Sequence, residues 1–349
     1  MNVELKHKQH YVFQRYLSAW TKENQLCCKR KGKKFSTGTI NVAQQRDFYR
    51  IMDLNDDEKK FLSIMWRKKS DETKEIMANY IRLYEEPLRV KRNLGIFKNA
   101  LVLRRFKDRE LPNEVSDQFA AMEADAEKYI NDLVEETYSD EEGRFTQTLV
   151  KLIAGDTDFY YHPYHEDDSA YDNTRREFLA HLCSQCYRTK ASRERMVYGL
   201  NRCLTLDFPE GLDIVKENIR PEHAAYCFLW YISGQMADAL YDMNAHLTLL
   251  HNDTNVHFIT TDQPVINLEA DYSDMTDEVT KIVLYYPITP TLAITVNDDN
   301  VHKSIKLSEN EVHYYNQRMA SASHEMIFAD DAELLDHYAG AGGTVNADA

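Results

Sequence analysis

The feature of this 349-residue chain that most restricts its fold is the separation of two hydrophobic patterns along the sequence. Up to Met243, apolar residues recur at helical spacing, whereas after Met243 short β-branched and aromatic runs alternate with turn residues. Helices and strands in separate stretches of a chain are typical of α+β proteins. We therefore predict an α+β fold with a helix-rich body and a small, mainly antiparallel sheet. The C-terminal third forms this sheet, and the N-terminal hairpin is a candidate to join it.

Start and stop signals place the helices. Asn55 is a good N-cap with Glu58 three positions on, so a helix should follow it. A second helix should begin near Asp71 and stop before Pro87, because proline lacks the amide that a helix interior requires. A long amphipathic helix is expected from about Ser116. Further helices are expected over 145–154, 170–187, 221–243 and 308–321.

Strand signals occur at both ends of the chain. Segments 25–28 and 34–42 flank a turn that contains Gly32, which predicts an N-terminal hairpin. Later strands are expected over 246–250, 256–260, 282–286, 292–296 and 326–329, with a turn over 287–290.

Nothing in the chain marks a domain linker. We expect one domain over 1–338, with a basic part (1–110), a helical middle (111–243) and a sheet-rich part (244–338). The tail 339–349 is rich in Gly and Ala, which predicts disorder. No run of about 18 apolar residues and no apolar leader is present, so we expect a cytoplasmic protein without a membrane partner.

Charge is distributed unevenly. The net charge is −15, yet residues 1–110 carry a net +12 and residues 111–349 a net −27. Clustered Lys and Arg attract polyanions, so the basic part is a candidate contact for phosphate-rich ligands. The basic turn is the best nucleic-acid candidate, with Lys29, Arg30, Lys31, Lys33 and Lys34. The alternative is that the two charged parts dock on each other or are solvated surface.

Five short motifs occur in an order that resembles a known family. They are His10 to Leu17 (His-Tyr-Val-Phe-Gln-Arg-Tyr-Leu), Phe48-Tyr49, Gln185 to Thr189, Thr260 to Val265 (Thr-Thr-Asp-Gln-Pro-Val) and Tyr286 to Pro290. The chain thereby resembles an uncharacterised bacterial family catalogued as domain of unknown function 4238. Phe13 and Thr261 stand where that family has Pro and Ser. The resemblance implies a fold and a bacterial source, and it implies no assigned activity.

Polar residues within these motifs are the candidates for chemistry. His10 would act as acid or base, Asp262 would orient or activate, and Arg188 would hold phosphate, as a metal-free ribonuclease or phosphodiesterase requires. The candidate ligand contacts are Gln14, Tyr16, Gln185 and Thr261. The alternative is architectural: Asp262 caps the turn before Pro264, and His10 is a hydrogen-bonded core residue.

Three weaker patterns are interpreted as structural. The Arg176 to His181 spacing resembles helical ribonucleases that cut RNA without metal, but five helical positions do not align two side chains. Cys183 and Cys186 lie within a helical pattern, without a second pair at zinc spacing. Loop 162–168 is an acidic stretch more typical of solvent exposure than of a metal site. We therefore expect neither a cofactor nor a metal.

Two functions follow as hypotheses. The first is an effector of toxin or phage-defence type that acts on RNA or a nucleotide by metal-independent acid–base chemistry, as a nuclease or phosphodiesterase would. The second is a non-enzymatic interaction module that binds a protein partner and whose polar core residues fix the fold. The sequence leaves the oligomeric state open.

Overall fold

The computed structural model describes residues 5–105, 111–161, 169–205, 216–273, 279–298 and 303–338. The chain divides into two compact units. Unit 1 comprises Met1–Gln9, Gln45–Ser139 and Cys203–Cys227, and unit 2 comprises His10–Gln44, Asp140–Arg202 and Phe228–Ala349. The boundary falls inside three helices, so the expectation of one domain stays a prediction. The expected disordered tail 339–349 and the acidic loop 162–168 lie outside the described residues.

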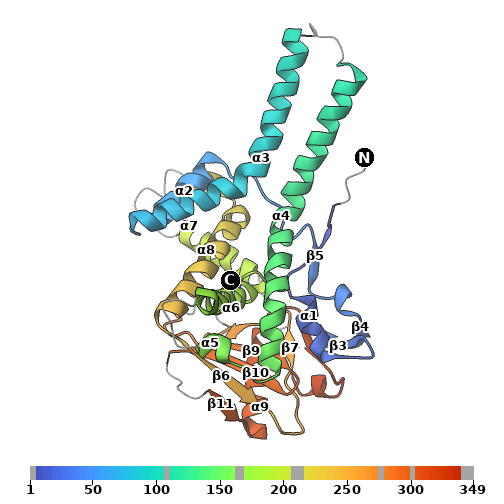
Figure 1. Ribbon diagram of the computed structural model, residues 1–349, viewed down its shortest axis with the longest axis vertical. Helices are drawn as coiled ribbons and strands as arrows, with labels where there is room; N and C mark the ends of the chain where they lie inside the picture. Colours follow the sequence, from blue (N-terminus) through green and yellow to red (C-terminus); the bar gives the residue numbers. More distant parts are fainter. Residues whose placement is uncertain are drawn as a thin grey trace. The chain divides into compact units, whose positions relative to one another are not determined.

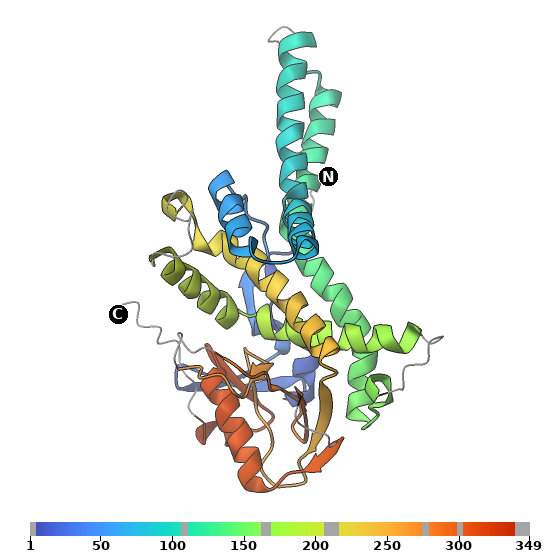
Figure 2. The same cartoon turned by 90° about the vertical axis from the view of Figure 1, so that its left-hand side faces the viewer.

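A pair of long antiparallel helices dominates unit 1 (Figures 1 and 2). Helix α2 (Asp56–Trp66) starts at Asn55 with a complete capping box, as predicted. Helix α3 (Asp71–Arg105) starts where it was predicted to start. The prediction that it stops before Pro87 is wrong, because the helix continues through the proline. After the proline, Lys91 and Lys98 of α3 pair with Glu127 and Glu123 of helix α4 (Asn113–Ile153), and these contacts help to offset the lost backbone hydrogen bond.

Helix α4 joins two stretches that the sequence separated. The expected helices from 116 and over 145–154 are one helix of 41 residues. Its first part belongs to unit 1 and its last part to unit 2. Met122 on this helix is half exposed.

Unit 2 contains two five-stranded sheets. The first has the order β11-β6-β10-β9-β8, antiparallel except for the parallel pair of β11 and β6. The second has the order β2-β3-β12-β7, with β4 paired to β3. The strands are β2 (Thr21–Lys22), β3 (Gln25–Arg30), β4 (Lys33–Thr37), β6 (His246–His251), β7 (Thr260–Thr261), β8 (Ile266–Asn267), β9 (Leu284–Thr289), β10 (Leu292–Asn297), β11 (Ser304–Lys306) and β12 (Met326–Ala329).

The N-terminal hairpin joins the C-terminal strands, as the sequence allowed. Strand β12 lies between β3 and β7, with Phe328 paired to Cys28 on one side and to Thr260 on the other. The expected turn over 287–290 is wrong at its start, because β9 continues to Thr289. Helix α9 (Glu309–Ala322) packs Val312 and Met319 into the same buried cluster as the sheet residues (Figure 2).

The remaining elements are five α-helices and two short strands among the described residues. Helices α6 and α8 match the predicted ranges closely, whereas α7 was not predicted. They are α1 (Gln14–Leu17), α5 (Asp158–Tyr161), α6 (Ser169–Tyr187), α7 (Lys190–Thr205) and α8 (Pro221–Asp242), with short strands β1 (Lys8–His10) and β5 (Gln44–Arg46) paired to each other. The fold class is α+β, as predicted. Within the described part of the chain, no helix is both long and apolar enough to cross a membrane.

Candidate functional site

Three of the five sequence motifs meet inside unit 2. The Tyr16 hydroxyl from the opening motif lies 2.6 Å from the Thr260 hydroxyl on β7, and the Tyr16 ring stacks on Tyr286. Trp20 donates its indole N–H to the Phe258 carbonyl oxygen at 3.1 Å. The opening segment is therefore packed against the strands that carry the later motifs.

Gln263 joins two of the motifs, Gln185 to Thr189 at the end of α6 and Thr260 to Val265 after β7. The Thr189 hydroxyl donates to Gln263 Oε1, and Gln263 Nε2 donates to the Cys186 carbonyl oxygen at 2.7 Å. The same amide nitrogen donates to the Val265 carbonyl oxygen at 2.9 Å. A buried side-chain amide thus fixes the turn after β7 to the end of α6.

Asp262, which directly follows β7, has a buried side chain. Its carboxylate accepts the backbone N–H groups of His324, Glu325 and Met326 at 2.9, 2.7 and 3.1 Å. Burial raises the pKa of Asp262, and the three donors oppose this rise. The residue holds the segment between α9 and β12 in place, which is a positioning role.

Arg188 is also internal. Its side chain is only 1% exposed and forms an ion pair with Glu142 on α4. With the Gln185 side-chain amide turned so that its oxygen faces Arg188, that oxygen accepts from the same guanidinium at 2.9 and 3.1 Å. A phosphate could reach Arg188 only by displacing these partners, and the expected role of Arg188 in holding phosphate stays a prediction.

His10, at the end of β1, and Gln14, at the start of α1, are in contact. Gln14 Nε2 donates to His10 Nδ1 at 2.9 Å, and His10 Nε2 lies 3.1 Å from the Ile40 carbonyl oxygen. These contacts fit a neutral imidazole with its proton on Nε2. Three of the candidate ligand contacts are fully buried, namely Tyr16, Gln185 and Thr261. Whether any of them touches a ligand stays a prediction.

The basic hairpin turn is partly neutralised by the end of the chain. Lys29 donates to the carbonyl oxygens of Leu335 and Tyr338 at 2.7 and 2.8 Å. Lys34 lies 2.6 Å from the Asp336 carboxylate. Lys31 and Lys33 are exposed in the turn and its edge. The run of five cations is therefore a weaker nucleic-acid candidate than the sequence alone suggests.

A charged cluster, which the sequence analysis missed, lies beside Asp262. We call it the His324 cluster; its members are His324, Glu325, Glu194, Lys190 and Arg30. His324 Nε2 lies 3.4 Å from Glu194 Oε2. Glu325 receives Lys190 Nζ at 2.5 Å on one oxygen and Arg30 Nη2 at 2.5 Å on the other. The cluster thus combines an imidazole–carboxylate pair with two cations around one carboxylate.

Electrostatics in this cluster follow from its mixture of burial and charge. The hydrogen bond from His324 lowers the pKa of Glu194. Contacts with Lys190 and Arg30 outweigh burial and lower the pKa of Glu325. Next to it, burial and then the charges of Asp262 and Glu325 raise the pKa of Tyr11 far above its ordinary range. Both glutamates are ionised near neutral pH, and Tyr11 keeps its proton.

The sequence carried one overlooked signal for this site. His324 and Glu325 directly precede the apolar strand β12. Polar side chains next to the end of a rigid strand are often functional. Lys190 and Glu194 lie on α7, which the hydrophobic pattern did not reveal.

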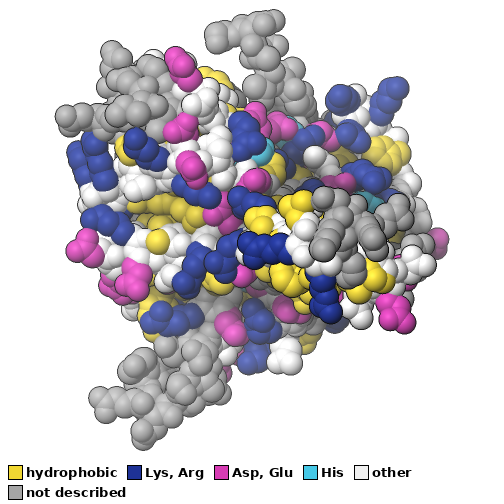
Figure 3. Space-filling model, turned by 90° about the horizontal axis from the view of Figure 1, so that it is seen from above, with side chains coloured by type: hydrophobic (Ala, Val, Ile, Leu, Met, Phe, Trp, Pro, Cys, Tyr) yellow, Lys and Arg dark blue, Asp and Glu magenta, His cyan; other side chains and the backbone are white. Residues whose placement is uncertain are grey.

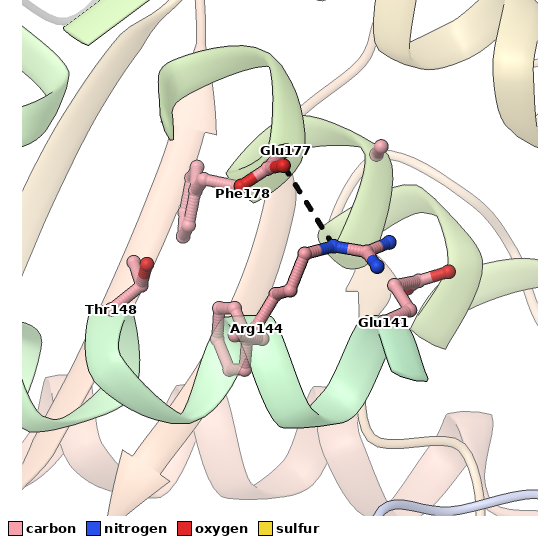
Figure 4. A pocket seen from close by; sticks show the side chains of 7 residues that line it. Glu141, Arg144, Thr148, Glu177 and Phe178 are labelled. Carbon is pink, nitrogen blue, oxygen red and sulfur yellow. Dashed lines mark ion pairs between the residues drawn. The ribbon is translucent and has the colours of Figure 1, made fainter. Parts of the chain in front are cut away.

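A separate pocket lies between α4 and α6. Glu141, Arg144 and Thr148 from α4 line it together with Glu177 and Phe178 from α6, and Arg144 reaches toward Glu177 at 3.7 Å (Figure 4). Its volume of about 110 Å³ is well below the roughly 300 Å³ or more of typical ligand pockets. It is too small for a nucleotide.

His181 lies behind this pocket and is fully buried. Its ring stacks on Phe145 with centroids 3.6 Å apart, and Nδ1 lies 3.1 Å from Glu141 Oε1. Burial lowers the pKa of His181, although Glu141 opposes this. Arg176, the other half of the ribonuclease-like spacing, instead covers the ring of Tyr241. The structure therefore separates the two residues of that pattern.

Cys183 and Cys186 are buried free thiols in α6, and burial raises the pKa of both. Among the described residues, no group of three or more His, Cys, Asp or Glu side chains is arranged to hold a metal ion. The candidate loop 162–168 is outside this survey.

The fold and the converging motifs define an α+β protein built around a shared buried junction. The chain belongs to the family described as "Protein of unknown function (DUF4238)", whose model matches residues 8–333, nearly its whole length. The expected family resemblance is thus confirmed. Neither the curated proteins nor the solved structures contain a significant match.

Proposed function

We propose that the protein binds a phosphate-bearing ligand, RNA or a nucleotide, at the His324 cluster and acts on it by metal-independent acid–base chemistry. The observation that supports this most is the triple hydrogen bond from the 324–326 backbone to the buried Asp262 carboxylate. A preorganised backbone is what an acid–base group needs, because catalysis depends on fixed geometry.

In this proposal the residues divide the work. His324 transfers a proton, and Glu194 holds the imidazole in one orientation. Lys190 and Arg30 bind phosphate at the place where they now hold the Glu325 carboxylate. Asp262 positions the segment and does not touch the ligand. The expected role of His10 as acid or base passes to His324.

The proposal retains the biological setting suggested by the sequence. An effector of toxin or phage-defence type that cleaves RNA should arrest growth when it is expressed. Arrest by the wild-type chain, and normal growth with His324→Gln, would support that setting.

Cleavage of a labelled single-stranded RNA pool in the presence of a chelator tests the chemistry. We expect His324→Gln to lower the rate by about 100-fold or more, the usual loss on removing a general acid or base. His10→Gln serves as the control, because its imidazole is held by Gln14 and Ile40. Absence of cleavage, loss of cleavage with the chelator, or an equal loss in both variants would refute the proposal.

A further inference from the structure

Arg195 on α7 carries a charge that no acceptor in the described part of the chain meets. Its guanidinium lies over the Tyr272 ring, 4.5 Å from the ring centroid, and the residue is partly buried. Among the described residues, no oxygen accepts a hydrogen bond from this guanidinium, and no carboxylate forms an ion pair with it. Burial lowers the pKa of Arg195, but an arginine stays charged near neutral pH. Because a buried charge without a partner is unfavourable, this guanidinium is suited to bind an anion from outside the chain.

Other arginines of unit 2 do have acceptors within the chain. The buried Arg188 is paired with Glu142, and Arg30 lies 2.5 Å from the Glu325 carboxylate. The missing acceptor is therefore a particular property of Arg195 and does not reflect how arginines pack in this unit.

The Tyr272 ring is a fixed support for the guanidinium above it. The Tyr272 hydroxyl oxygen accepts the backbone N–H of Asn267 at 2.7 Å. Arg318 on α9 donates to the carbonyl oxygens of Leu268 and Ala270 at 2.5 and 2.6 Å, so the turn that leads to the ring is held as well. A guanidinium over a fixed aromatic ring keeps its planar set of N–H donors available, which is the geometry with which arginine binds phosphate.

The cations of unit 1 differ from Arg195 in this respect. Figure 3, which looks toward the loop end of the α3–α4 pair, shows Lys and Arg side chains close to Asp and Glu side chains. Lys91 lies 2.5 Å from Glu127, and Lys98 lies 3.1 Å from Glu123. A polyanion would have to displace these carboxylates, so unit 1 is the weaker candidate for binding phosphate.

Helix α7 places Arg195 beside the His324 cluster. Glu194, whose carboxylate lies 3.4 Å from His324 Nε2, directly precedes Arg195 in the chain. Although burial lowers the pKa of Arg195, the charges of Asp262 and Glu194 oppose this effect, so the guanidinium lies within reach of both carboxylates. Arg195 is therefore a further cation at the candidate site.

Lys190 and Arg195 are not arranged to bind the same phosphate. They are five positions apart on α7, which corresponds to about 7.5 Å along the helix axis and about 140° around it. Lys190 is directed to Glu325, whereas Arg195 is directed to Tyr272. The linked phosphates of one nucleotide share an oxygen atom and require cations that converge. Consecutive phosphates of a nucleic-acid strand are separated by a ribose, so they suit cations that are separated in this way.

We propose that Arg195 binds a second phosphate of the ligand, beside the phosphate that Lys190 and Arg30 bind, and that the ligand is single-stranded RNA rather than a mononucleotide. This inference rests on the function proposed for the His324 cluster and narrows its substrate class. Proteins that bind single strands combine a cationic path along the backbone with aromatic side chains, and Tyr272 beneath Arg195 matches this combination.

Titration calorimetry at fixed low salt with two 2′-O-methyl ligands tests the second phosphate site. The methyl group prevents cleavage through the ribose oxygen, so binding is measured alone. The dinucleotide UpU has a single phosphate, whereas a uridine octamer has several. Arg195→Gln should weaken binding of the octamer at least fivefold and binding of UpU less than twofold. Lys190→Gln should weaken binding of both ligands at least threefold.

Salt dependence gives a second measure, because it counts phosphate contacts. Each contact contributes about 0.7 to the slope of log K against log salt for a single strand, so Arg195→Gln should reduce the slope for the octamer by about this amount. Arg195→Lys keeps the charge and should keep the slope. The matched control is Arg144→Gln, which removes the same charge from the separate pocket between α4 and α6 and should leave the slope unchanged.

Thermal unfolding without ligand separates a binding role from a structural one. Because Arg195 has no acceptor among the described residues, Arg195→Gln should melt at the same temperature as wild type or higher. A lower melting temperature together with equal weakening of both ligands would assign Arg195 a structural role and overturn the inference. Octamer binding that is unchanged in Arg195→Gln would overturn it and leave the proposed function intact. Absence of octamer binding by wild type would overturn both.

Discussion

The motif junction of unit 2 and the outer side of the α3–α4 pair in unit 1 use polar and apolar residues in opposite ways. At the junction, Asp262, Gln263 and Arg188 are buried and bonded to internal partners. On the helix pair, Phe97 and Tyr129 are 61 and 58% exposed. Buried polar groups without partners and large exposed apolar surfaces are both unfavourable. The junction bonds its buried polar groups within unit 2, whereas these apolar side chains of the helix pair stay exposed.

The largest effect should come from the junction. Asp262→Ala leaves three backbone N–H groups without their acceptor, and we expect it to lower the free energy of unfolding by about 4 kcal/mol. Urea unfolding followed by circular dichroism measures this. The comparison variant is Leu83→Ala, which changes a residue of α3 that is 58% exposed. A loss below about 1 kcal/mol for Asp262→Ala would mean that the junction is not a positioning device.

The second prediction concerns pH at the buried imidazole. Since burial lowers the folded-state pKa of His181 below its ordinary value of 6.5, the unfolded chain takes up this proton first as pH falls. His181 therefore favours the folded state fully above pH 6.5, and this contribution is lost progressively below it, by at most about 1.4 kcal/mol per pH unit.

His181→Phe isolates that effect, because phenylalanine keeps the stacking on Phe145 but cannot titrate. Between pH 7.5 and 5.5 the variant should lose less stability than wild type in urea titrations. Equal losses in the two proteins would show that His181 is not the titrating group.

The smallest effect should come from the outer side of the α3–α4 pair. Val90 is 44% exposed, so Val90→Asp should change the free energy of unfolding by no more than about 0.5 kcal/mol, as is usual for exposed positions. Thermal unfolding at 1 µM checks this. A loss above about 2 kcal/mol would place Val90 in the core and remove the contrast between the regions.

The sequence predicted the elements whose signals are local. The Asn55 capping box, α6, α8 and the strands β6, β10 and β12 follow from caps and periodicity. Pro87 misled the analysis because packing of α3 on α4 outweighs a local penalty. Helix α7 was missed because its exposed face is mixed in character.

The motifs contained residues of the buried junction, such as Asp262 and Arg188, but they did not show that these residues are buried. None of the members of the His324 cluster lies in a motif. Burial depends on which surfaces long-range packing covers, and a single sequence does not contain that information. His324 and Lys190 belong to the site only because the start of β12 and the start of α7 lie close together in the fold.

The central claim is that Lys190 and Arg30 form a phosphate site that Glu325 now occupies as an internal anion. Isothermal titration with a short single-stranded RNA, at fixed low salt, measures it in three chains. The dissociation constant should fall at least threefold in Glu325→Gln and rise at least threefold in Lys190→Gln, with wild type between them. An absence of binding in all three chains, or weaker binding by Glu325→Gln than by wild type, would contradict the account.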